Sequence, residues 1–142
     1  MRAVLVSLLL CPPAYAWEAT VGEICTLSHD METAHVFLTY DPAQPLYTLT
    51  ITHRTDRWAA SPWFAMRFDG PKPIEIATAL HTLSDDQTAL TAADTGFGNV
   101  LDGLEYNETA LAFTQDQVIR IPLDGAAPEV RKFRSCSGAQ MS

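Results

Sequence analysis

Apolar and polar residues alternate along most of the chain with a period of two. In the segment 46–53, Tyr47, Leu49 and Ile51 share one face, while three threonines share the other. Such alternation is typical of a β-strand with one buried face. Seven further segments show a similar pattern, namely 22–28, 34–40, 63–68, 73–78, 87–92, 109–114 and 117–123.

Clusters of turn-forming residues separate these segments, for example at 41–42, 69–71 and 84–86. Seven or eight short strands with few helical patterns indicate a mainly β fold. We therefore expect an antiparallel β-sandwich or barrel with a short C-terminal helix.

Two segments in the C-terminal third break the alternation. After Asn99, a candidate helix cap, Val100, Leu101 and Leu104 fall on one helical face, which predicts a short helix that ends before Asn107. The second helix is expected after Asp124-Gly125, because apolar residues then recur at spacings of four and three. Its buried face holds Ala126, Val130 and Phe133 with Cys136 close by, and its outer face is expected to hold Glu129, Arg131, Lys132 and Arg134.

The N-terminal segment 1–16 is typical of a secretory signal peptide. A single Arg2 precedes the apolar run 3–10, and Ala14-Tyr15-Ala16 matches the small-x-small pattern of a cleavage site. The run is too short for a membrane span, which needs about 20 apolar residues. A lipid on Cys11 is the other alternative, but Leu10 before it is not small. We therefore predict cleavage after Ala16, a periplasmic or secreted protein without a membrane anchor, and one domain over 17–142.

Removal of the signal segment leaves two cysteines, Cys25 and Cys136, so only one pairing is possible. In an oxidising compartment two such thiols form a disulfide. Closing a loop of roughly 100 residues stabilises the fold by up to about 4.7 kcal/mol in the chain-entropy model. A redox-active pair, the alternative, needs close spacing such as Cys-x-x-Cys, which these residues lack.

Composition and charge narrow the class of partner. The chain is 47% hydrophobic and 18% charged, which favours a folded interior over disorder. Its formal net charge is −8, and loss of Arg2 makes it one unit more negative. This balance argues against nucleic acid or an anionic membrane surface as partner, because both require basic patches.

Three residues near the first predicted turn, His29, Met31 and His35, form the densest set of potential metal ligands. Imidazole and thioether groups together suit copper. The simpler interpretation is a polar turn between two strands, because this spacing matches no common metal site. The sequence indicates no other cofactor.

A contact surface is the second candidate site. The segment 57–64 holds Arg57, Trp58 and Trp63, and tryptophan and arginine dominate binding hot spots. Tryptophans beside strands also pack in cores, so the two interpretations differ in whether Trp58 is exposed.

Catalytic motifs are missing from the sequence. There is no Gly-x-Ser-x-Gly, Ser-x-x-Lys or His-Glu-x-x-His pattern. Because catalytic groups meet in space rather than in sequence, a small hydrolase with a site assembled from distant residues stays an alternative.

The segment 121–127 (Ile-Pro-Leu-Asp-Gly-Ala-Ala), followed by Val130, Phe133 and Cys136, resembles the ending of small exported proteins of the invasion-associated locus B type. The resemblance covers about a third of the chain. It implies a compact, disulfide-bridged β fold outside the cytoplasm and supplies no catalytic residues. The function predicted is that of a non-catalytic binding module of the cell envelope, with an envelope or secreted protein as partner.

Overall fold

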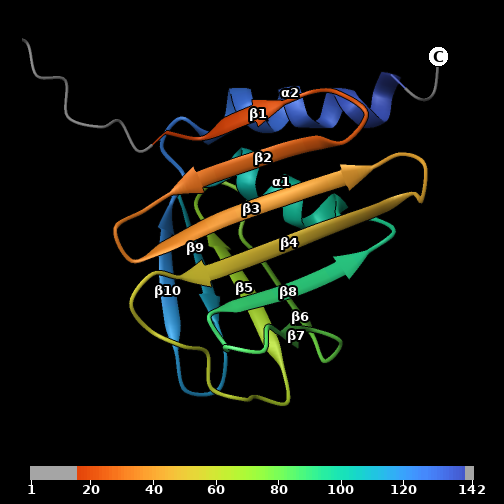
Figure 1. Ribbon diagram of the computed structural model, residues 1–142. Helices are drawn as coiled ribbons and strands as arrows, with labels where there is room; N and C mark the ends of the chain where they lie inside the picture. Colours follow the sequence, from red (N-terminus) through yellow and green to blue (C-terminus); the bar gives the residue numbers. More distant parts are fainter. Residues whose placement is uncertain (1–15, 140–142) are drawn as a thin grey trace, which may run out of the picture.

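The computed structural model describes residues 16–139, so residues 1–15 of the predicted signal segment lie outside the described part. The described residues form two helices and ten strands (Figure 1). In chain order the elements are β1 (Glu18–Thr20), β2 (Cys25–Asp30), β3 (Ala34–Asp41), β4 (Leu46–His53), β5 (Phe64–Asp69), β6 (Ile74–Thr78), β7 (Thr82–Leu83), β8 (Ala89–Asp94), α1 (Gly98–Tyr106), β9 (Thr109–Phe113), β10 (Val118–Pro122) and α2 (Ala126–Ala139).

The strands form two antiparallel sheets. The six-stranded sheet has the order β1-β2-β3-β4-β8-β7, and the four-stranded sheet has the order β10-β9-β5-β6. Figure 1 shows the strands of the smaller sheet running steeply across those of the larger one. The fold is therefore sandwich-like and not a closed barrel, which confirms the predicted class and decides between its two forms.

All eight segments predicted from the alternation contain strands. The strands β1 and β7 were missed because three and two residues are too few to show a period. The segment predicted from residue 87 is a strand only from Ala89 onward. Gln87 has a positive φ of 62° and its N–H donates to the Ser84 carbonyl at 2.9 Å, so it belongs to a turn.

Both predicted helices are present. The first begins at Gly98, so Asn99 lies inside its first turn, and Phe97 precedes it without any side-chain cap hydrogen bond. In α2, Val130 and Phe133 are buried as predicted. The two helices contact each other, α2 also packs on β1 and β2, and α1 packs on β5 and β6. Neither helix has the length and apolar character that a membrane-spanning segment requires.

An aromatic cluster connects the larger sheet to both helices. Tyr47 of β4 stacks on Tyr40 of β3, with ring centroids 4.2 Å apart. The same ring stacks on Phe97 at 5.3 Å and lies 6.3 Å from Phe133 of α2. Aromatic pairs at such distances add to the hydrophobic stabilisation of the core. The cluster fixes the beginning of α1 against the larger sheet.

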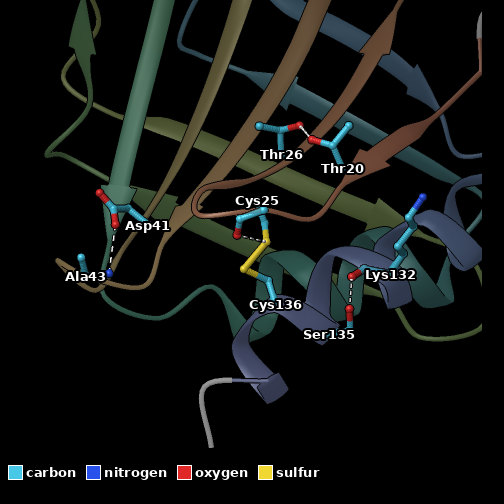
Figure 2. The surroundings of a disulfide bond; sticks show 9 residues. Thr20, Cys25, Thr26, Asp41, Ala43, Lys132, Ser135 and Cys136 are labelled. Atoms are coloured by element: carbon cyan, nitrogen blue, oxygen red, sulfur yellow. Dashed lines mark hydrogen bonds between the residues drawn. A yellow bond between two sulfur atoms is a disulfide. The ribbon is translucent and has the colours of Figure 1, made fainter.

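A disulfide joins Cys25 at the start of β2 to Cys136 in α2, with a Cα–Cα distance of 6.2 Å. Figure 2 shows the two sulfurs between the β2 ribbon and the helix. Both cysteines are buried. The crosslink spans 111 residues of sequence, and it holds α2 on the same strands that the helix contacts through its apolar face.

The prediction that Arg134 lies on the outer face of α2 is wrong. Its guanidinium is half-buried between the helices, where Nη1 donates to Glu105 Oε1 at 2.8 Å and Nη2 to Asp102 Oδ1 at 2.6 Å. Burial alone would lower the pKa of Arg134, but the two carboxylates raise it overall. Conversely, the hydrogen bond from Arg134 lowers the pKa of Asp102. An ion-paired network therefore joins the two helices.

Candidate ligand pocket between the sheets

The three proposed copper ligands do not converge. His29 of β2 faces the core with 5% of its surface exposed, while His35 of β3 points to the opposite face of the same sheet. His29 stacks on Trp17 at a centroid distance of 4.5 Å. Histidines on opposite faces cannot bind one ion together, so a site built from this pair with Met31 is ruled out. The described residues also contain no group of three His, Cys, Asp or Glu side chains suited to a metal.

Of the two interpretations of the segment 57–64, the structure supports packing of Trp58 in the core and contradicts a contact surface around it. Only 1% of the Trp58 side chain is exposed, and its indole N–H donates to the Ile51 carbonyl at 3.0 Å. Trp63 is half-buried with its ring edge-on to Phe113, and Arg57 is exposed. Because Trp58 fills the core and Trp63 packs against Phe113, these residues do not form an aromatic patch.

A carboxylate and an imidazole meet on the outer face of the larger sheet. His35 Nδ1 lies 2.6 Å from Asp30 Oδ1, and Arg54 also pairs with Asp30. The hydrogen bond from His35 lowers the pKa of Asp30. A hydrolase would also need a nucleophile beside the imidazole, but no hydroxyl of the described residues hydrogen-bonds to His35. The pair closes the β2–β3 hairpin on an exposed surface and supplies no cleft.

The described residues do contain a cavity of about 500 Å³ between the two sheets. It lies where β4 and β8 of the larger sheet face β5 and β6 of the smaller one, and the first turn of α1 closes one side. Its larger apolar side chains are Leu49, Phe64, Met66, Ile76, Phe97 and Val100. The interior is therefore suited to an apolar group.

The alternation that builds the strands also explains why this space is open. On the inner face of β8, Leu90 is fully buried and fills the core, but two residues further on the same face carries only Ala92. Ala92 is the cross-strand partner of Leu49. Beyond the strand, Gly96 and Gly98 line the cavity without side chains, and a Cβ at either position would have no neighbour within 4 Å.

The mouth of the cavity lies at a seam between sheet edges. The strand β6 ends the smaller sheet, and β8 pairs with β7 only at Leu90 and Thr91. Within residues 16–139, the later residues of β8 therefore have no strand partner on that side. Three polar side chains line the cavity here, namely Thr78, Asp94 and Asn99. The site thus combines apolar side chains in its interior with polar groups at its mouth, as ligand pockets usually do.

Sequence reasoning missed this site because none of its residues belongs to a chemical motif. The available signal was a set of small residues at the end of a strand and just beyond it, namely Ala92, Ala93, Gly96 and Gly98. Comparisons of the chain with protein-family models, with curated proteins and with solved structures find no match. The resemblance to the invasion-associated locus B type therefore stays a prediction.

Proposed function

We propose that the protein is an exported, non-catalytic binding module that holds a small apolar molecule between its two sheets. The observation that carries this proposal is the cavity of about 500 Å³ with its apolar interior. Ligand sites in proteins typically measure about 300–1,000 Å³ and are lined mostly by apolar side chains. At roughly 30 Å³ for each water-sized group, the space suits a ligand of about 15 non-hydrogen atoms.

A protein partner was the other expectation for a binding module of the envelope. It depended on an exposed aromatic surface at Trp58, and the burial of that side chain removes this support. The cavity gives a binding role a different basis, in which the ligand enters the protein instead of covering a flat surface.

Export is the second element of the proposal. The signal-like segment 1–16 supports it, and the buried Cys25–Cys136 disulfide fits an oxidising compartment. Mass spectrometry of the protein from its own cells should find Trp17 as the first residue. Retention of the first sixteen residues, or free thiols at both cysteines, would contradict export.

The binding role is tested with N-phenyl-1-naphthylamine, an uncharged probe whose fluorescence rises in apolar surroundings. We expect saturable 1:1 binding to the protein that carries residues 17–142. Substitution Ala92→Leu places a larger side chain in the cavity, and we expect it to weaken probe binding at least tenfold. The substitution should leave the urea midpoint unchanged or raise it, because it fills a void.

Ala43→Leu is the matched control, since Ala43 is exposed in the β3–β4 turn and does not line the cavity. It should bind the probe like the parent protein. If Ala92→Leu fails to fold, Ile76→Trp provides a second obstruction, because Ile76 is only half-buried at the edge strand β6. Unchanged probe affinity in a folded, obstructed variant would refute the proposal, as would a parent protein that does not bind the probe.

A further inference from the structure

The rim of the cavity carries one ionised side chain. Among the described residues that line the cavity, Asp94 is the only acid, and lysine, arginine and histidine are missing. Thr78 and Asn99 supply uncharged hydrogen-bonding groups beside it. A bound molecule therefore meets an apolar interior and a single negative charge at the mouth.

The Asp94 carboxylate is available to a ligand. It is exposed, and its Oδ1 accepts hydrogen bonds from the Thr95 backbone N–H at 2.6 Å and from the Thr95 hydroxyl at 3.4 Å. Within residues 16–139 it takes part in no ion pair, unlike Asp30, Asp69 and Asp102. Its charge is thus not neutralised by a cationic side chain of the described part of the chain.

Two nearby positive groups act against the charge of Asp94, but neither neutralises it. The N-terminus of α1 opens on the cavity, but a helix dipole is equivalent to only about half a unit charge. The Arg134 guanidinium lies 3.4 Å from the Gly98 carbonyl, yet it is already paired with Asp102 and Glu105. The net charge at the mouth of the cavity therefore stays negative, in agreement with the net charge of −8 for the whole chain.

We propose that the natural ligand is a cationic amphiphile, with an apolar body in the cavity and a protonated amine at the Asp94 carboxylate. This inference rests on the proposed function, because it assigns a head group to the molecule that the cavity holds. An anionic head group would meet the carboxylate without a compensating cation. An uncharged head group would hydrogen-bond to Thr78 or Asn99 and gain no ion pair.

The head group is tested by displacing N-phenyl-1-naphthylamine with decylamine, decanol and decanoate at neutral pH, below their micelle concentrations. The three molecules share one alkyl chain, so differences in affinity report the head group. We expect the amine to bind about five- to tenfold more tightly than the alcohol, which corresponds to roughly 1–1.4 kcal/mol for an accessible ion pair. Decanoate should bind most weakly.

Asp94→Asn should remove the preference for the amine and leave decanol affinity unchanged. Asp94→Lys should reverse the order and favour decanoate. The control Asp124→Asn changes the net charge equally at an exposed residue of the β10–α2 connection that does not line the cavity, so it should keep the amine preference. This control separates binding at the mouth from general attraction of a cation to an acidic protein.

The outcomes distinguish the two proposals. If the probe binds in the cavity but the three head groups compete equally, or decanoate competes best, the inference fails and the proposed function stands. The inference also fails if the amine preference survives in Asp94→Asn or disappears in Asp124→Asn. If the probe does not bind the parent protein, both proposals fail.

Discussion

Gly103 of α1 lies directly on the ring of Phe68 in β5. A Cβ at Gly103 would stand 2.3 Å from Cδ2 of that ring, and Phe68 is fully buried. The glycine therefore allows the helix to approach the smaller sheet closely.

Gly103→Ala should destabilise the protein. Overpacking of a core costs about 1–3 kcal/mol, and a real Cβ essentially never approaches this closely. The substitution also gains about 1 kcal/mol of helix propensity, which offsets part of the cost. We expect a net loss of up to about 2 kcal/mol in the free energy of unfolding, measured by urea titration. Gly98→Ala in the same helix is the control, because its Cβ would have no neighbour within 4 Å. Equal stability of the two variants would show that α1 is not held this close to β5.

The stability of the protein should depend on the protonation of His29. Burial lowers the pKa of its imidazole below 6.5, although the Ala16 backbone and the Asp30 carboxylate act weakly in the opposite direction. Below about pH 6.5 the unfolded chain therefore binds more protons than the folded one, and stability falls as the pH decreases from 7 to 5.

His29→Phe keeps a ring against Trp17 and removes this titration. Its unfolding free energy should vary less between pH 7 and pH 5 than that of the parent protein. Burial also lowers the pKa of His53, so the double variant with His53→Phe should vary least. Urea titrations at several pH values provide the comparison. If the unfolding free energy of His29→Phe changed with pH as much as that of the parent protein, His29 would not be the group responsible.

Loss of the disulfide should be costly. The double variant Cys25→Ala/Cys136→Ala removes a crosslink over 111 residues, which is worth about 2–5 kcal/mol. Its urea midpoint should fall to that of the reduced parent protein, because both chains have the same unconstrained unfolded state. A reductant should have no further effect on the double variant. If the reductant did not change the urea midpoint of the parent protein, the disulfide would contribute nothing to stability.

Substitutions of Arg134 and Glu105 should have strongly non-additive effects on the free energy of unfolding, because the two side chains form an ion pair. Only 5% of the Glu105 side chain is exposed, so Arg134→Met leaves a nearly buried carboxylate with Arg131 at 3.7 Å as its remaining cation. We expect a loss of about 1.5–3 kcal/mol. Adding Glu105→Gln should recover much of this loss, because the uncompensated charge disappears. Additive effects in a double-mutant cycle would mean that the two side chains do not interact.

Eight of the ten described strands were predictable because apolar and polar residues alternate along them. The two helices were predictable as well, because apolar residues recur at helical spacing in each of them. These residues are Val100 and Leu104 in α1, and Val130 and Phe133 in α2. The exact first residues of the helices were harder to predict. Asn99 is a good helix cap by residue type, yet Phe97 occupies that position because its ring joins the aromatic cluster around Tyr47.

Apart from the disulfide, features that depend on two distant elements could not be predicted. Arg134 looks like a surface residue of α2 until α1 brings Asp102 and Glu105 beside it. Trp58 lies in a polar connection, and only the folded chain shows the Ile51 carbonyl that accepts its N–H. The cavity also depends on distant elements, because the small side chain of Ala92 leaves a space only where β5 and β6 of the other sheet face it.

The bond between Cys25 and Cys136 turns most of this protein into a covalent ring. Every strand from β2 to β10, together with α1, lies on that ring. A protease that cuts a loop such as β3–β4 or β6–β7 would open the ring without producing separate fragments. The nicked molecule would keep both pieces and would reveal the cut only after its sulfur bridge is reduced.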